Sequence, residues 1–158
     1  MKAIVVGIGN PILRDDSVGI KVVERVKERI DVETAVLTTT GFDVLDKILD
    51  HDFAIIVDAI RTGNRPGTIY ELSVEEISLT DRYTNSHNLN LATTLKLGYT
   101  IFPERMPEVR ILAVEVEDVE SFGEDCTPEV EKAIPKVVER IEEILKSLRT
   151  PPRRSRDT

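Results

Sequence analysis

The sequence has little that could cross-link the chain or bind metal through sulfur. Cys126 is its single cysteine, so neither an intrachain disulfide nor a zinc site built from several thiolates can form. No run of about 18 apolar residues is present, which excludes a membrane-spanning helix of ordinary length. The first residues lack the basic, apolar and small-residue pattern of a secretory signal. We therefore expect a cytoplasmic protein that does not act in a membrane.

Basic charge is also scarce. The chain has 21 Lys and Arg against 29 Asp and Glu, for a net charge of -8 at pH 7. Binding to nucleic acid needs clustered Lys and Arg, so a nucleic-acid partner is disfavoured. The one basic cluster is residues 149–158, with four arginines and two helix-breaking prolines. We expect a single domain over residues 1–148, followed by a tail over 149–158 without ordered structure.

Tryptophan and glutamine are absent, whereas charged residues make up 32% of the chain. An excess of Glu, Lys and Arg is typical of proteins from hyperthermophiles. The composition therefore favours a thermophilic source, and a melting midpoint well above the mesophilic range would agree with it.

Short apolar runs alternate with amphipathic segments along the chain. This alternation predicts an α/β fold with a mostly parallel sheet that is covered by helices on both faces. We expect residues 73–85, which are polar and rich in turn formers, to form a loop. The expected strands are 3–8, 32–38, 53–57, 68–72 and 109–116, and the expected helices are 17–30, 41–49, 86–98 and a last one that begins with Thr127 as N-cap.

Polar residues follow the expected strands where ligands bind in such sheets, beyond the carboxyl ends. Asp58 comes directly after the most apolar strand, and Asp15 and Asp16 stand at the start of the first helix. His87 lies near the start of a later helix. One imidazole and two carboxylates would make an open site for a divalent ion such as nickel or zinc. At most one of the two adjacent aspartates can point into it.

Each of these residues also has a structural interpretation. Asp58 could pair with a nearby base such as Arg61, because a buried carboxylate needs a partner. Asp15 and Asp16 occupy positions where helix caps and first-turn acids are favoured. His87 could be a hydrogen-bonded loop histidine. The spacing of these residues matches no metal-binding motif, so sequence alone leaves both interpretations open.

Neither the other histidine nor the glycine-rich loop after the first expected strand predicts a further binding site. His51 precedes the third expected strand at the opposite edge of the sheet, and we interpret it as structural or solvated. Gly7–Gly9 begins like a dinucleotide-binding loop, but Ile12 stands where the third glycine is required. The acids that follow would repel a phosphate, so nucleotide binding is disfavoured.

The segment Gly7–Gly19 resembles the signature of the nickel–iron hydrogenase maturation endopeptidases, G-x-G-N-x-L-x-x-D-D/E followed by a small residue, an apolar residue and Gly. The chain departs from many family members at Thr38–Gly41, which is not acidic, and at Cys126, where Leu is common. Weaker matches follow in order at Ile56–Ala59, Pro66–Thr68, Ser86–Leu89, Phe122–Gly123 and Thr127–Val130.

The resemblance implies a three-layer fold with a twisted five-stranded sheet, mostly parallel, whose one antiparallel strand corresponds to residues 68–72. It implies a peptidase that removes the C-terminal extension of a hydrogenase large-subunit precursor after nickel insertion. The family's metal-binding positions match Asp16, Asp58 and His87, which are therefore our candidate catalytic and metal-binding residues. The nickel would arrive with the precursor, and zinc or cadmium can occupy such a site in vitro.

Two alternatives remain at this stage. Asp16 and Asp58 could share a proton and act as an aspartic-type pair that needs no metal. The chain could instead be a non-catalytic metallochaperone that docks on a hydrogenase subunit. With two histidines and one cysteine, the sequence shows no recognisable Ser-His-Asp or Cys-His arrangement that would favour a different hydrolase.

Overall fold

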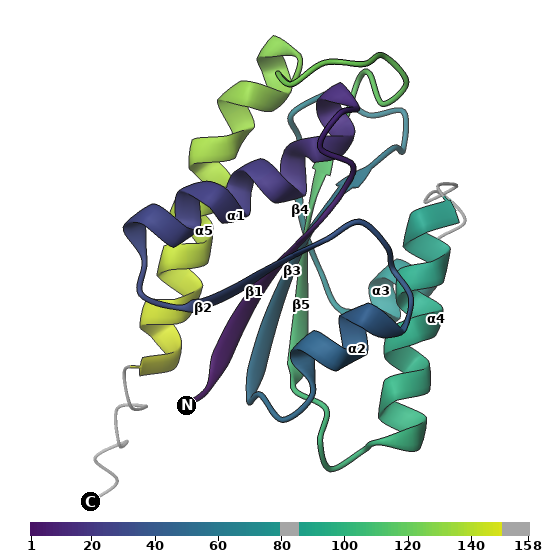
Figure 1. Cartoon of the computed structure of the whole chain (residues 1–158), viewed down its shortest axis with the longest axis vertical. Helices are drawn as coiled ribbons and strands as arrows, with labels where there is room; N and C mark the ends of the chain where they lie inside the picture. Colours follow the sequence, from purple (N-terminus) through teal and green to yellow (C-terminus); the bar gives the residue numbers. More distant parts are fainter. Residues whose placement is uncertain (80–85, 150–158) are drawn as a thin grey trace, which may run out of the picture.

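The computed structural model of the chain describes residues 1–79 and 86–149, and for residues 78–79 and 86–89 it describes the backbone alone. A central sheet lies between two layers of helices (Figure 1). The strands are β1 (Ala3–Ile8), β2 (Glu33–Leu37), β3 (Phe53–Ile60), β4 (Ile69–Leu72) and β5 (Glu108–Glu115), and the helices are the 3-10 turn η1 (Arg14–Ser17), α1 (Val18–Arg29), α2 (Phe42–Ile48), α3 (Val74–Leu79), α4 (Ser86–Ile101) and α5 (Pro128–Arg149).

The sheet has five strands in the order β2-β1-β3-β5-β4. Neighbouring strands are parallel except for β4, which runs antiparallel to β5. This confirms the expected three-layer α/β fold with one antiparallel strand. From β1 the chain passes through α1 on one face of the sheet to β2, and from β2 it passes through α2 on the other face to β3 (Figure 1). The direction in which strands are added therefore reverses between β1 and β3. In open sheets the crevice at such a reversal, beyond the carboxyl ends of the strands, is where ligands bind.

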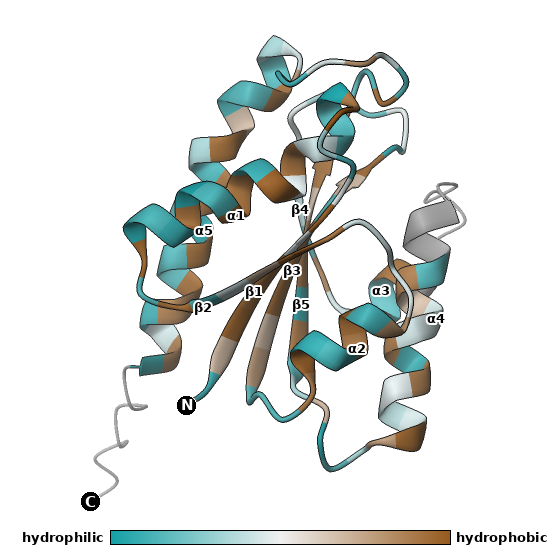
Figure 2. Cartoon of the chain, viewed as in Figure 1, coloured by the Kyte–Doolittle hydropathy of each residue, from teal (hydrophilic) through white to brown (hydrophobic). Residues whose placement is uncertain are grey.

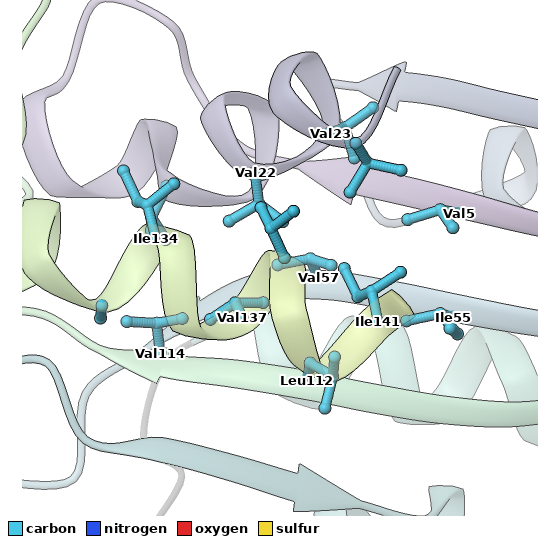
Figure 3. Packing of buried hydrophobic residues seen from close by; sticks show 14 of the residues in the cluster. Val5, Val22, Val23, Ile55, Val57, Leu112, Val114, Ile134, Val137 and Ile141 are labelled. Carbon is cyan, nitrogen blue, oxygen red and sulfur yellow. The ribbon is translucent and has the colours of Figure 1, made fainter. Parts of the chain in front are cut away.

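Each face of the sheet has its own hydrophobic core, because successive side chains of a strand point to opposite faces. Figure 3 shows the core beneath α1 and α5, to which Val22 of α1, Val137 of α5 and Val57 of β3 belong. The apolar sides of α1 and α5 face the sheet (Figure 2). Ile56 and Ile60 of β3 belong to the opposite core, beneath α2, α3 and α4. Asp58 lies between them in the alternation and therefore faces that second layer.

Strand β3 is longer than the apolar run at 53–57 predicts. It continues to Ile60, because Ala59 and Ile60 are also apolar and pair with Val114 and Glu115 of β5. Asp58 thus lies inside the strand, opposite Ala113, rather than after its end.

The expectation of a loop throughout 73–85 is wrong for residues 74–79, which form α3. The Ser73 hydroxyl accepts a hydrogen bond from the Glu76 N–H at 3.1 Å, and the Glu76 carboxylate accepts one from the Ser73 N–H at 3.2 Å. This reciprocal capping box starts the helix. Residues 80–85 of the same segment lie outside the described residues.

Only the first residue of the expected C-terminal tail is among the described residues. Arg149, which we assigned to the tail, is the last residue of α5, and its guanidinium donates a hydrogen bond to the Asp31 carbonyl at 3.0 Å. The remaining tail residues, 150–158, lie outside the described residues. Within the described part of the chain, no helix is both long and apolar enough to cross a bilayer.

Candidate active site

The turn η1 and the start of α1 lie directly on the carboxyl ends of β1 and β3. Gly9 and Gly19 allow this close approach, because neither has a side chain to separate the two backbones. A side chain on Gly9 would collide with the Asp16 carbonyl oxygen, and one on Gly19 would collide with the carbonyl oxygen of Val57. The same side chain on Gly19 would come within 2.6 Å of the Ile8 carbonyl oxygen. The turn η1 and the first turn of α1 are thereby held on the carboxyl ends of β1 and β3.

Asp15 is a structural residue. It is fully buried, and its carboxylate accepts hydrogen bonds from the N–H groups of Glu117 and Asp118, both at 2.9 Å, and from the Thr127 N–H at 2.6 Å. The Thr127 hydroxyl donates to it as well, at 2.8 Å. Asp15 therefore ties the β5–α5 loop and the start of α5 to η1. Neither acid caps α1, because Ser17 is its N-cap and its first turn holds no acid; both instead stand in the first turn of η1.

Asp16 has a different environment from its neighbour. It is 9% exposed, and its Oδ2 accepts a hydrogen bond from the Asn10 N–H at 3.0 Å. This contact closes the loop between β1 and η1 over the carboxyl end of the sheet. The turn η1, which carries Asp16, contacts β3, and the negative charge of Asp16 adds to the raised pKa of Asp58. The structure therefore places both candidate residues at the carboxyl end of β3.

Asp58 is the most unusual polar residue of the described chain. Only 4% of it is exposed, and one carboxylate oxygen accepts a hydrogen bond from the Ala59 N–H at 2.8 Å. The other oxygen, Oδ2, is buried without a hydrogen-bond partner among the described residues. Burial raises the pKa of Asp58 well above its usual range; the Ala59 N–H opposes this shift, and the charge of Asp16 adds to it. Buried polar atoms almost always have partners, so Oδ2 is available to a proton, a cation or a donor that the described side chains do not supply.

His87 lies in the first turn of α4, and its side chain is outside the described part of the chain. The helix packs on the sheet face toward which Asp58 points. Two turns further on, the Thr94 hydroxyl donates to the carbonyl of Thr40, just beyond β2, at 2.8 Å. The early turns of α4 are therefore at the carboxyl edge, as Figure 1 also shows. Side chains that are described form no group of three His, Cys, Asp or Glu suited to a metal, but that set does not include His87.

A buried acid that sequence reasoning missed lies at the end of β5. Glu115 is 1% exposed and accepts hydrogen bonds from the Thr62 N–H at 2.9 Å, from the Thr62 hydroxyl and from the Tyr70 hydroxyl at 3.1 Å. The Asn64 amide donates to the Tyr70 oxygen at 2.8 Å. These bonds fasten the β3–β4 loop. The signal available in the sequence was an acid that follows an apolar run, as Asp58 also does.

His51 is structural, as expected. It is 8% exposed at the amino edge of the sheet, and its Nε2 lies 2.6 Å from the Glu33 carboxylate. Its Nδ1 lies 3.2 Å from the Ile48 carbonyl oxygen. Both ring nitrogens have protein partners, so His51 is not available as a ligand.

Comparison with known proteins decides the family. Residues 20–144, which are more than half of the chain, match the hydrogenase maturation protease family. The chain belongs to this family. The protease is therefore a peptide-bond hydrolase that acts on a hydrogenase precursor, which sets aside the interpretation as a non-catalytic metallochaperone. The matched segment contains Asp58 and His87 and begins after Asp16.

Individual relatives agree with this assignment. The protease is 32% identical over 149 residues to the hydrogenase 2 maturation protease of Escherichia coli, a match that covers 89% of this chain and 88% of the relative. It is 26% identical over 154 residues to the hydrogenase expression/formation protein HupD of Rhizobium leguminosarum, covering 92% of this chain and 75% of that protein.

Solved structures show the same fold. The hydrogenase maturating endopeptidase HybD from Escherichia coli superposes with a TM-score of 0.77 over 93% of both chains, at 27% identity. The maturation protease HybD from Thermococcus kodakarensis gives a TM-score of 0.75 over 91% of this chain and 99% of that one. Its sequence identity is 22%, so this second likeness bears on the fold alone.

Proposed function

We propose that this protease removes the C-terminal extension of a nickel–iron hydrogenase large-subunit precursor after nickel insertion, and that it recognises the bound nickel through Asp16, Asp58 and His87. The observation that carries the proposal is the buried Oδ2 of Asp58, which has no partner among the described residues and feels the negative charge of Asp16. Two neighbouring carboxylates that are shielded from water repel each other, so ionising both is unfavourable unless they share a proton or bind a cation. A nickel ion that enters with the substrate supplies such a cation.

The donor set suits this substrate. Two carboxylates and one imidazole are ligands that divalent nickel accepts, and zinc or cadmium can replace nickel in vitro. Because nickel belongs to the precursor, only a loaded precursor would be anchored with its scissile peptide at the site. The same residues that bind the ion would thus act as the checkpoint on cofactor insertion.

Cleavage is a hydrolysis. Water attacks the scissile carbonyl carbon, a carboxylate of the Asp16–Asp58 pair accepts a proton from that water, and the C–N bond breaks as the leaving amine is protonated. The nickel of the substrate can polarise the attacking water or the carbonyl oxygen. The masses of the mature subunit and the released peptide together equal that of the precursor plus one water.

A second candidate mechanism needs no metal. The raised pKa of Asp58 next to Asp16 also favours one shared proton, as in aspartic-type peptidases. The variant His87→Ala separates the two mechanisms. A proton-sharing pair retains its activity without this imidazole, whereas nickel recognition through three ligands loses most of it.

The experiment that tests the proposal is mass spectrometry of the large-subunit precursor, nickel-loaded and nickel-free, with and without the protease. We expect the nickel-loaded precursor to be converted into two products and the nickel-free precursor to stay intact. Equal cleavage of both forms would contradict recognition through nickel.

A further inference from the structure

An exposed apolar side chain lies on the loop that is hydrogen-bonded to the segment before Asp16. Phe122 is 79% exposed, although the chain has only four phenylalanines. It pairs with Leu13 in an isolated antiparallel bridge, and the adjacent Ile12 is 55% exposed. Single exposed apolar residues are common on protein surfaces, so Phe122 is distinguished by the backbone that holds it and by the charge around it.

The backbone around Phe122 is fastened to the site. The Gly123 N–H donates to the Ile12 carbonyl at 2.9 Å, and the Arg14 N–H donates to the Ser121 carbonyl at 3.3 Å. The Asp15 N–H donates to the Asp118 carbonyl at 2.9 Å. Asp16 follows directly in the chain. A partner held on Phe122 is therefore held at a fixed position relative to Asp16.

The surroundings of Phe122 are acidic. Residues 117–125 contain five acids and no base. Asp118 lies 3.7 Å from the guanidinium of Arg14. The other four acids are exposed, and their side chains form no ion pair with the described residues; they are Glu117, Glu120, Glu124 and Asp125.

This charge selects among possible partners. A second copy of the chain on a two-fold axis would place these acids against the same acids, and like charges across an interface are costly. A segment that carries an apolar side chain among Lys or Arg residues is complementary both to the exposed Phe122 ring and to the acids around it. We propose that Phe122 and the surrounding acids form a docking surface for a basic and apolar segment of the hydrogenase precursor. This proposal rests on the proposed function for the identity of the partner.

The test measures binding of the purified precursor, both nickel-loaded and nickel-free, to the full-length protease. In Phe122→Ser we expect the Kd for either precursor form to rise roughly tenfold or more, because buried aromatic anchors dominate interface energies. The control is Ile101→Ser, at the opposite end of α4, where the side chain is 52% exposed. Both variants change exposed residues, so both are expected to fold, and Phe122→Tyr should retain binding.

Charge is tested separately. The double variant Glu120→Lys/Glu124→Lys should weaken precursor binding and reduce its dependence on salt, whereas Glu139→Lys on the exposed face of α5 should leave both unchanged. Unchanged Kd in Phe122→Ser and in the double variant would overturn the docking surface. A wild-type dimer that Phe122→Ser abolishes, with precursor binding unaltered, would overturn it in favour of self-association.

Different experimental results would contradict the docking surface and the proposed function. Cleavage that does not depend on nickel contradicts the nickel checkpoint, while binding of the nickel-free precursor still reports on Phe122. Nickel-dependent cleavage with a KM that is unaltered in Phe122→Ser contradicts the docking surface alone.

Discussion

The two edges of the sheet differ in one respect: only the carboxyl edge holds a buried carboxylate oxygen that lacks a partner among the described residues. At the amino edge, the His51 ring lies 2.6 Å from the Glu33 carboxylate, and Arg105 donates two hydrogen bonds to Asp50 at 2.9 and 2.7 Å. At the carboxyl edge, Asp58 keeps an oxygen without a partner among the described residues. The comparison teaches that burial of a charged group at a strand end does not decide its role: His51 has protein partners for both ring nitrogens, whereas Asp58 keeps one oxygen for a partner that the described residues do not supply.

The same contrast occurs between two adjacent residues at the carboxyl edge. Asp15 is saturated by hydrogen bonds from Thr127 and from the backbone of the β5–α5 loop. Asp16 accepts one from the Asn10 N–H and lies beside Asp58. Burial alone does not mark a functional acid; the difference lies in whether the protein itself supplies the partners.

The largest expected effect is on cleavage by Asp58→Asn. Removing this charge should lower kcat/KM on the precursor by about a hundredfold or more, the range for loss of a positioned acid–base group. The free energy of unfolding should stay the same or rise, because an unpaired buried carboxylate costs stability. Kinetics and urea denaturation measure the two quantities.

The control for that variant is Asp50→Asn at the amino edge, which removes an exposed ion pair and should leave cleavage unchanged. If Asp58→Asn lost much stability but kept its cleavage activity, Asp58 would be a structural residue, and the proposed difference between the two edges would be contradicted.

Asp15→Ala should produce the largest loss of stability. Its removal leaves the buried Thr127 donors and the partly buried Asp118 N–H without an acceptor, which we expect to lower the free energy of unfolding by about 3 kcal/mol. Asp16→Ala should cost less than about 1 kcal/mol and act on cleavage instead. Urea denaturation of both variants makes the comparison, and equal losses would contradict the assignment of different roles.

Cys126 belongs to the anchored part of the carboxyl edge and should be unreactive. Burial raises the pKa of this thiol to about 11, and the hydrogen bond with the Ser17 hydroxyl opposes the shift. Relative to the ordinary value of 9.0, the thiolate fraction at neutral pH falls about a hundredfold. Alkylation followed by mass spectrometry should be slow in the native protein and fast in urea; fast native alkylation would show that this region opens.

The smallest expected effect is on the pH dependence of stability at the amino edge. The hydrogen bond with His51 holds the pKa of Glu33 below its ordinary value of 4.5. The pair therefore stabilises the fold above pH 4.5, and this contribution disappears as the pH falls toward the lowered pKa. Tm should fall slightly more on acidification in the wild type than in Glu33→Gln. Identical Tm profiles would show that the pair contributes nothing.

The sequence predicted the sheet well because its strands are short apolar runs whose burial on both faces leaves a clear pattern. It missed α3, although Ser73 and Glu76 have the spacing of a capping box. It placed the end of β3 too early, because Asp58 interrupts the apolar run and the pairing of Ala59 and Ile60 with β5 is a tertiary property.

The site was predictable only in part. Strand ends pointed to Asp58, and the family resemblance selected Asp16 over Asp15. The physical reason for that choice lies in contacts between Asp15 and residues more than 100 positions away, such as Thr127, which no local pattern reveals. The network around Glu115 was missed for the same reason, since Thr62 and Tyr70 reach it only through the fold.

The most direct test of the central claim is the ratio of kcat/KM on nickel-loaded precursor to that on nickel-free precursor, measured for the wild type and for Asp16→Ala, Asp58→Ala and His87→Ala. If these three side chains recognise the nickel, the ratio is large in the wild type and falls toward one in each variant. A ratio that stays as large in the variants as in the wild type would contradict the account, because nickel would then be recognised by other residues.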